Sequence, residues 1–394
     1  MTISEDKKYV MNTYSRFPIT LVKGEGVKVW DKDGKEYLDF VGGIAVNALG
    51  HSHQAVVNAI KEQADKLIHC SNLYWTENQI ELAKLICENS FGKSVFFCNS
   101  GAEANEGAIK LARKYGNTKY KGKRYKIITA KNSFHGRTYG ALTATGQIKY
   151  HNGFEPLLDG FVYVDYNDLN SLQSAVDENT CAIMLEVIQG EGGVNEADSN
   201  YLKEVKNLCE KNDLLLIFDE VQTGIGRTGK LFAYEHSGVV PDVMTLAKAL
   251  GGGVPIGALV VNEKADIFVP GNHASTFGGN PLACAAGKIV MNIISQKSFL
   301  DEVKEKGEYF KGELEKLKSK FSIIKKVKGK GLMLGVELDT NDGSKIVKKS
   351  MEKGLLINVI NHNILRFVPP LIISKKEIKD GIEILKDVFL EMNS

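Results

Sequence analysis

The chain lacks a strong excess of either charge. Its 394 residues include 50 Lys plus Arg and 48 Asp plus Glu, so the formal net charge is only +2. Proteins that bind nucleic acids or anionic membranes carry basic patches that this balance does not suggest. We therefore expect neither a nucleic acid nor a membrane as a partner.

The sequence also lacks long hydrophobic runs. No apolar stretch approaches the ~20 residues that a membrane-spanning helix needs. Residues 1–9 are polar and charged, without the apolar core of a secretory signal. We therefore expect a cytoplasmic protein.

Spacings typical of metal and redox sites are missing. The six cysteines form no C-x-x-C pair, which argues against a zinc ribbon or a thioredoxin-type site. Cys98 and Cys181 stand among apolar residues, so we interpret them as small buried hydrophobic residues. His51 and His53 have no third ligand at helical spacing, and the sequence predicts no metal site.

Nucleotide-binding motifs are absent or out of place. The P-loop pattern G-x-x-x-x-G-K-[ST] does not occur. Residues 224–229 match G-x-G-x-x-G, but the match does not directly follow a strand. No acid stands on a second strand about twenty residues further on. We therefore reject a dinucleotide-binding fold.

The sequence does contain a regular alternation of short apolar strands and helices over residues 51–285. Such alternation is typical of a large α/β domain with a mainly parallel sheet. The predicted strands are 95–98, 126–130, 182–187, 214–218, 243–246 and 258–261, and the predicted helices are 54–68, 103–115 and 202–211.

The pattern of alternating apolar strands and helices ends near residue 290. A Lys- and Glu-rich helix is predicted over 298–320, a strand over 331–338, and two further helices after it. We expect a smaller C-terminal α+β domain over 286–394. The N-terminal segment 1–50, which contains a predicted hairpin, would join this smaller domain.

Asp219 directly follows the apolar strand 214–218, at the end of the strand where parallel sheets bind ligands. A buried carboxylate is costly unless it meets a cation or a strong donor, and a protonated pyridine nitrogen is such a partner. An acid at a strand end also binds magnesium in P-loop enzymes, but the chain lacks their motif.

Lys248 lies between the strand 243–246 and the glycine run 251–253. An ordinary interpretation is a solvated loop lysine. Its neighbours are apolar, however, and glycines let a bulky ligand approach the backbone. A desolvated lysine has a lowered pKa and becomes nucleophilic, as Schiff-base chemistry requires.

Small residues at 100–102 begin the helix that follows the strand 95–98. Free backbone N–H groups and the helix dipole favour an anion such as phosphate at this point. An ordinary N-cap by Asn99 or Ser100 explains the same residues equally well, so both interpretations stay open.

These pieces follow one another in a fixed order: 99–103, Phe-His-Gly-Arg-Thr at 134–138, 186–193, 219–222 and Lys248. The order resembles the class III (subgroup II) aminotransferases that depend on pyridoxal 5'-phosphate (PLP), from about Tyr14 to Pro370. Segment 216–257 is similar to the family's signature around the cofactor lysine. The resemblance implies fold type I, with a large domain built on a mainly parallel seven-stranded sheet and a smaller α+β domain.

The resemblance also implies the residues that bind PLP. Lys248 would hold the cofactor as a Schiff base and move a proton. Asp219 would pair with the pyridine N–H and keep the ring an electron sink. The remaining cofactor-binding residues would be Ser100, Gly101, Ala102, Phe134, Glu220, Val221, Gln222 and Thr276. Thr276 would reach the phosphate of the neighbouring subunit, so a homodimer with shared active sites is expected.

The same resemblance implies how substrates are held. Arg137 would bind the α-carboxylate of the amine donor through paired hydrogen bonds. Arg366 would bind the second carboxylate of 2-oxoglutarate, and Glu191 would act as a catalytic switch that releases Arg366 for it. A purely structural ion pair between these two residues is the alternative. Tyr14 and Ser275 would lie near the substrate.

Within the class, the similarity is greatest to enzymes that use acetylornithine, in segments 12–16, 43–47, 71–74 and 275–281. The implied activity moves the distal amino group of N2-acetylornithine to 2-oxoglutarate, giving glutamate, as in arginine biosynthesis. Succinylornithine, N-acetyl-lysine-type substrates, ornithine and 4-aminobutyrate stay open, because pockets separate small apolar differences by only ~1–3 kcal/mol.

The chain departs from the family pattern at two positions. Val187 replaces a frequent proline, and Ile44 replaces an aromatic residue of ornithine enzymes, which disfavours free ornithine as a substrate.

Two other classes of function are less favoured. A PLP aminomutase would not need the second carboxylate site that Arg366 implies. A protein that only binds would not need both Lys248 and Asp219.

Overall fold

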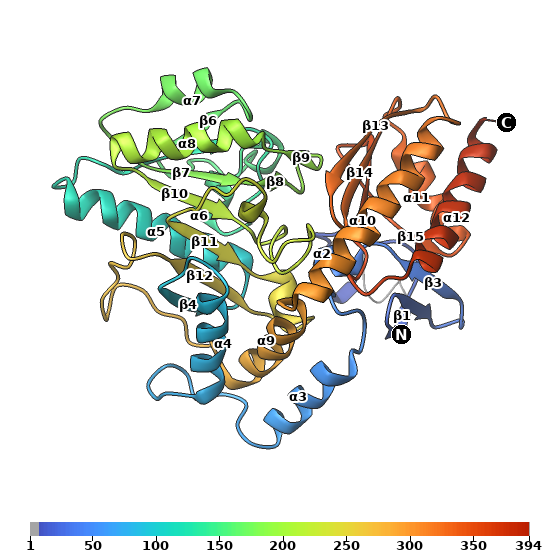
Figure 1. Ribbon diagram of the computed structural model, residues 1–394, viewed down its shortest axis with the longest axis horizontal. Helices are drawn as coiled ribbons and strands as arrows, with labels where there is room; N and C mark the ends of the chain where they lie inside the picture. The colour runs from blue at the N-terminus through green and yellow to red at the C-terminus, as the bar shows by residue number, and fades with distance from the viewer. Residues whose placement is uncertain (1–7, 394) are drawn as a thin grey trace.

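The computed structural model describes residues 8–393, which form two lobes side by side (Figure 1). The larger lobe is built on a seven-stranded sheet with the order β4-β12-β11-β10-β7-β5-β6. Its strands are β4 (Ser94–Cys98), β5 (Lys126–Ala130), β6 (Phe161–Val164), β7 (Thr180–Glu186), β10 (Leu215–Asp219), β11 (Val243–Leu246) and β12 (Gly257–Val261).

This sheet is mainly parallel, as predicted. Only β12 runs antiparallel to its neighbours β11 and β4, and the other pairs are parallel. All six strands predicted for this domain are present within two residues of their predicted ends. The sequence analysis missed β6, which is a four-residue edge strand that is mostly only half-buried.

The central strands are continuous apolar runs because helices cover both faces of the sheet. In β10, Leu215 and Ile217 pack in one core cluster with α5 (Gly101–Lys119). Leu216 and Phe218 point to the opposite face, into the cluster that contains α8 (Ser199–Asn212). This alternation is the two-residue period of a strand, and burial of both faces leaves only the strand ends for polar residues.

The other helices of the larger lobe differ more from the sequence prediction. They are α3 (Gln54–Ala64), α4 (Glu77–Glu88), α6 (Tyr139–Ala144), α7 (Leu169–Ala175) and α9 (Pro281–Ile294). The predicted helix 54–68 is too long: it ends at Ala64, and Leu67 and Ile68 are exposed beyond it. The sequence analysis missed α6 because five of its six residues are buried, so it has no polar face.

The smaller lobe contains two four-stranded sheets. One is antiparallel and consists of β13 (Ile324–Lys330), β14 (Met333–Leu338), β17 (Ile364–Phe367) and β16 (Asn358–Ile360). The other consists of β1 (Leu21–Glu25), β2 (Lys28–Asp31), β3 (Glu36–Asp39) and β15 (Leu355–Leu356). The helices are α10 (Lys297–Lys318), α11 (Gly343–Glu352) and α12 (Lys375–Asn393).

The N-terminal segment is tied to the C-terminal part of the chain by backbone pairing. β2 and β3 form the predicted hairpin, and β15 adds to β3 in parallel. The predicted boundary between residues 285 and 286 falls inside α9, a continuous helix. The division into 1–50, 51–285 and 286–394 stays a prediction.

Arg227, in the glycine-rich turn that had suggested a dinucleotide site, joins the two lobes instead. Its side chain is 1% exposed, and Nη1 donates to the carbonyl oxygens of Leu332 at 3.0 Å and Pro369 at 2.6 Å. Leu332 N donates in return to the Arg227 carbonyl at 3.0 Å. Burial lowers the pKa of Arg227 to about 9. No helix among residues 8–393 combines the length and the apolar character needed to cross a membrane.

Helix α10 packs closely against this junction at Gly307. A Cβ atom at Gly307 would lie 2.4 Å from the Gly331 carbonyl oxygen, whereas Gly312 of the same helix has open space around it. We expect Gly307→Ala to lower the free energy of unfolding by about 1–3 kcal/mol through overpacking. Gly312→Ala, the matched control, should raise it by up to about 1 kcal/mol because alanine favours helices. Denaturant unfolding of the three proteins measures both effects, and equal stability of the two variants would contradict the packing.

Candidate active site

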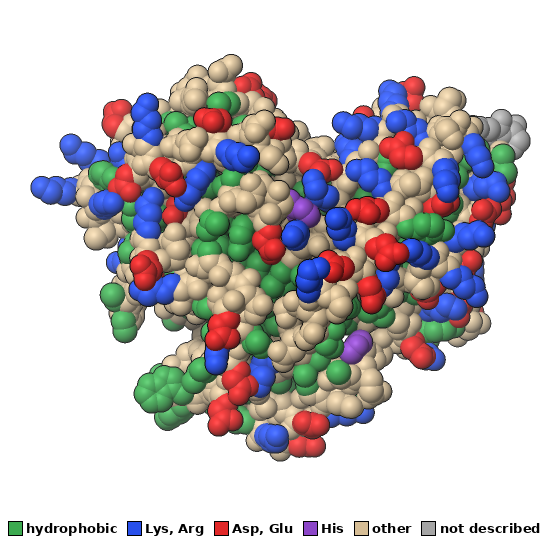
Figure 2. Space-filling model, in the orientation of Figure 1, with side chains coloured by type: hydrophobic (Ala, Val, Ile, Leu, Met, Phe, Trp, Pro, Cys, Tyr) green, Lys and Arg blue, Asp and Glu red, His purple; other side chains and the backbone are tan. Residues whose placement is uncertain are grey.

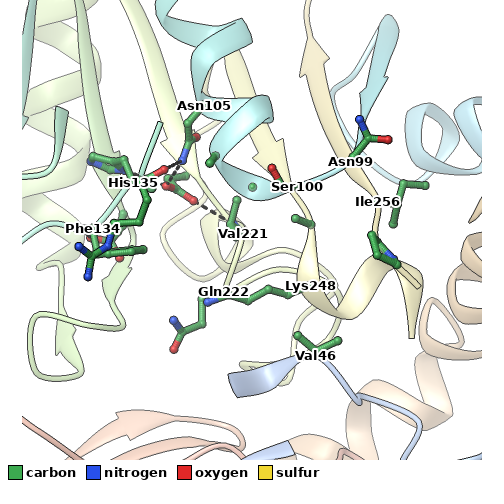
Figure 3. Close-up of a pocket in the computed structure, with 18 of the residues that line it drawn as sticks. Val46, Asn99, Ser100, Asn105, Phe134, His135, Val221, Gln222, Lys248 and Ile256 are labelled. Atoms are coloured by element: carbon green, nitrogen blue, oxygen red, sulfur yellow. Dashed lines mark hydrogen bonds and ion pairs between the residues drawn. The ribbon is translucent and has the colours of Figure 1, made fainter. Parts of the chain in front are cut away.

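A cavity of about 440 Å³ lies where strands β4, β5, β7, β10 and β11 end (Figure 3). The structure brings nine of the residues expected from the sequence to its wall: Ser100, Gly101, Ala102, Phe134, Arg137, Asp219, Val221, Gln222 and Lys248. These residues come from segments up to 148 positions apart, so the fold alone unites them.

Asp219 is the last residue of β10, and its buried carboxylate accepts three hydrogen bonds. Oδ2 accepts from Asn105 Nδ2 at 2.7 Å and from His135 Nδ1 at 2.8 Å. Oδ1 accepts from Val221 N at 3.0 Å. These donors compensate for the lost hydration of the carboxylate, and they fix its orientation at the cavity.

A second layer of hydrogen bonds holds these donors. Thr245 Oγ1 donates to Asn105 Oδ1 at 2.7 Å, and Asn105 Nδ2 donates to the His135 carbonyl at 2.7 Å. The sequence analysis missed the roles of Asn105 and His135. The family resemblance had marked the motif that contains His135, which gave one indication of its importance. Asn105 lies inside α5, and no sequence pattern distinguished it from its neighbours.

Lys248 follows β11 after one residue, Ala247, and begins a short 3-10 turn, η3 (Lys248–Gly251). Its φ angle is +44°, in the left-handed region that residues with a Cβ rarely adopt. Such local strain concentrates at functional sites. Burial lowers the pKa of its amine to about 8, although the nearby Glu191 carboxylate opposes the shift.

The first turn of α5 forms another part of the wall. Ser100 caps the helix, because its side chain accepts from Glu103 N at 3.2 Å. The ordinary N-cap interpretation is therefore correct, but Gly101 and Ala102 also line the cavity. A Cβ atom at Gly101 would lie 2.6 Å from Val221 Cγ1, so glycine permits this close approach. N–H groups in a first helical turn have no partner within the helix and suit an anion.

Glu191 and Arg366 form an ion pair beside Gln222. Arg366 Nη1 lies 2.5 Å from Glu191 Oε1 and 3.2 Å from Gln222 Oε1. Burial alone would raise the pKa of Glu191, but the charges of Arg366 and Lys248, with the hydrogen bonds from Arg366 and Gln222, together lower it. Arg366 comes from β17 of the smaller lobe, so this pair spans the two lobes.

Glu186 is a further cavity residue that the sequence analysis did not single out. Its carboxyl group accepts from Phe134 N at 3.1 Å and from Gly190 N at 3.2 Å. Burial, together with Asp219 on the adjacent strand, raises the pKa of Glu186 well above its ordinary value. Glu186 thus links the Phe134 loop to the loop that carries Glu191.

Six expected site residues are not on the wall of this cavity: Glu191 and Arg366, described above, and Tyr14, Glu220, Ser275 and Thr276. Glu220 accepts from Ala233 N and Tyr234 N, both at 2.8 Å, and so holds the loop after β10 together. Tyr14 is 70% exposed. Ser275 and Thr276 line a separate hollow of about 360 Å³.

Residues 8–393 contain no group of three or more His, Cys, Asp or Glu side chains placed to hold a metal ion. The ionisable and aromatic groups on the cavity wall include the amine of Lys248, the carboxyl groups of Glu186 and Asp219, the guanidinium of Arg137 and the ring of Phe134.

Comparisons with known proteins point to one family. The family model described as aminotransferase class-III matches residues 9–389. The acetylornithine aminotransferase of Caldanaerobacter subterraneus subsp. tengcongensis is 66% identical over 390 residues, which cover 99% of each chain. The acetylornithine aminotransferase of Methanocaldococcus jannaschii is 53% identical over 391 residues, which cover 99% of this chain and 98% of that protein.

Solved structures give the same picture. An ornithine aminotransferase from Toxoplasma gondii matches with a TM-score of 0.95 and 36% identity, covering 99% of this chain and 94% of that one; a second structure of this enzyme is described with PLP at its active site. The N-acetylornithine aminotransferase of Stenotrophomonas maltophilia K279a matches with a TM-score of 0.85 and 37% identity, covering 99% of both chains.

The lowered pKa of Lys248 predicts when its amine becomes reactive. A protonated amine cannot attack a carbonyl carbon, so the rate of covalent PLP uptake by cofactor-free protein should rise with pH and level off above about 8. Stopped-flow absorbance across pH 6–11 measures this profile. A midpoint near the ordinary lysine value of 10.5 would contradict the burial of this amine.

Proposed function

We propose, on the premise that this chain belongs to the class-III aminotransferase family, that it moves the distal amino group of N2-acetylornithine to 2-oxoglutarate. The observation that carries the proposal is that Asp219, at the end of β10, and Lys248, just after the neighbouring strand β11, line one cavity, with Arg137 on its wall. The high identity to acetylornithine aminotransferases over nearly the whole chain supports the substrate.

The donor set of the cavity fits PLP. Lys248 would hold the cofactor covalently, because burial lowers the pKa of its amine to about 8 and so leaves a larger share unprotonated at physiological pH than in an ordinary lysine. Asp219 would hold the pyridine N–H, and the first turn of α5 would hold the phosphate. Phe134 offers an aromatic face for the ring. Bound PLP supplies an electron sink for the carbon that carries the reacting amine.

Lys248 is also suited to move the proton that amino transfer requires. A general acid or base works best when its pKa lies near the working pH, and the pKa of this amine is about 8. Its strained backbone points the side chain from the end of β11 into the cavity (Figure 3). Three donors hold the carboxylate of Asp219, which also lines the cavity, in a fixed orientation.

Two arginines would each bind a carboxylate group of a substrate. Arg137 would bind the α-carboxylate of acetylornithine, which leaves the distal amine to reach the cofactor that Lys248 would hold. Arg366 would bind the second carboxylate of 2-oxoglutarate once Glu191 releases it. The ion pair between Arg366 and Glu191 at 2.5 Å supports this switch, because an unpaired buried guanidinium would be costly in the absence of the dicarboxylate.

A homodimer with shared active sites is part of the proposal. The loop between α3 and α4 exposes Leu73, Tyr74 and Trp75 by 83%, 72% and 91%, and it projects as a hydrophobic patch below the larger lobe in Figure 2. Exposed apolar patches of this kind mark surfaces that bind other proteins. Thr276 and Ser275 lie outside the cavity of their own chain, where a partner's site could use them. The cytoplasmic location stays a prediction.

Steady-state kinetics with 2-oxoglutarate and a panel of amines tests the proposal. The panel contains acetylornithine, succinylornithine, ornithine, N-acetyl-lysine and 4-aminobutyrate. We expect the highest kcat/KM for acetylornithine and glutamate as the product, with no turnover by Lys248→Ala. A preference of about 100-fold for succinylornithine or 4-aminobutyrate would overturn the proposed substrate, since it corresponds to nearly the full ~1–3 kcal/mol by which a pocket separates substrates with small apolar differences. Turnover without glutamate would favour an aminomutase.

A further inference from the structure

Arg137 meets the cavity from the loop between β5 and α6, and its surroundings are mainly aromatic. The centre of its guanidinium lies 4.1 Å from the ring centroid of Tyr150 and 5.7 Å from that of Phe134. Apart from these contacts, the Arg137 side chain is largely exposed to solvent. The closer of these two contacts, with Tyr150, involves a residue that does not line the cavity.

A long exposed arginine needs such a restraint to bind a carboxylate well. Its side chain carries about 2 kcal/mol of rotamer entropy, which binding would otherwise have to overcome. Stacking on an aromatic face attracts the guanidinium when it lies within ~6 Å of the ring centroid. Stacking also leaves the N–H edge free for paired hydrogen bonds to a carboxylate.

Tyr150 is itself held in place by the loop that presents Phe134. It ends the short helix η1 (Ile148–Tyr150), and its N–H donates to Gln147 O at 3.0 Å. Gln147 Nε2 donates to Ser133 O at 2.9 Å. The rings of Tyr150 and Phe134 meet edge to face, with centroids 5.7 Å apart. The two rings therefore form one rigid support for Arg137.

We infer that Tyr150 is a positioning residue that orients Arg137 for the α-carboxylate of the amine donor. The inference rests on the proposed function, in which Arg137 binds that carboxylate. Tyr150 acts through Arg137 and touches neither the reacting amine nor the cofactor. It therefore contributes to the recognition of substrates that carry an α-carboxylate and not to the chemical step.

Two substrates distinguish an effect of Tyr150 on α-carboxylate binding from a general loss of activity. Acetylornithine carries the α-carboxylate, and N-acetylputrescine is the same molecule without it. In Tyr150→Leu we expect KM for acetylornithine to rise about tenfold, within the range of a partly desolvated cation–π contact, while kcat stays within about twofold of its wild-type value. For N-acetylputrescine, kcat/KM should be unchanged. Tyr150→Phe keeps the ring and should restore the wild-type KM.

Ile148→Ala is the matched control, because Ile148 lies in the same short helix and is 77% exposed. It should leave both substrates unaffected. Lys149→Ala keeps the Tyr150 ring but removes two contacts of Lys149 Nζ: the hydrogen bond to Asn361 Oδ1 at 3.1 Å and the cation–π contact 5.0 Å from the Tyr150 ring centroid. It should also leave KM for acetylornithine unchanged. Thermal unfolding of all four variants shows whether each is folded as well as the wild-type protein.

A binding measurement without turnover completes the test. N-acetylnorvaline has the α-carboxylate of acetylornithine but no distal amine, so calorimetry can measure its Kd. We expect a tenfold weaker Kd in Tyr150→Leu and an unchanged Kd in Tyr150→Phe. An unchanged Kd in Tyr150→Leu, or an equal loss of kcat/KM with N-acetylputrescine, would overturn the inference. Failure of the proposed function is a separate result, because the wild-type protein would then form no glutamate from acetylornithine.

Discussion

The buried carboxylate of Asp219 is the constraint on which the site depends. A carboxylate at the end of a fully covered strand is stable only when donors replace its water. Here Asn105 comes from α5, His135 from the loop after β5, and the Val221 N–H from the loop after β10. Satisfying one acid therefore fixes three segments relative to one another, and the same segments form most of the cavity wall.

Three further charged side chains, Lys248, Arg137 and Arg366, lie at different places in and beside the cavity. Lys248 stands at the end of the neighbouring strand with a lowered pKa. Arg137 and Arg366 lie on different elements, so two carboxylates can be bound at different places. Arg366 belongs to the smaller lobe and its partner Glu191 to the larger. Correct packing of the lobes is therefore a condition of substrate binding, and the buried Arg227 contributes to it.

Much of this arrangement could be predicted from the sequence, and the rest could not for identifiable reasons. Strands that are apolar along their whole length can be recognised in the sequence. Asp219 at the end of β10 and Lys248 after β11 were therefore found from the positions of the strand ends. Asn105, Glu186 and Tyr150 were missed because their roles depend on neighbours that are distant in sequence. The edge strand β6 and the mostly buried α6 were missed because neither shows a regular alternation of polar and apolar residues. The family resemblance supplied Tyr14, Ser275 and Thr276, which a single chain does not bring to the cavity.

The central claim is that Lys248 holds PLP covalently in this cavity, opposite Asp219. Reducing the PLP-treated protein with borohydride makes such a bond permanent, and peptide mass mapping then locates it. The account predicts one pyridoxyl group per chain, on the peptide that contains Lys248, and none in Lys248→Arg. A label on another lysine, or none on a protein that has bound PLP, would contradict it.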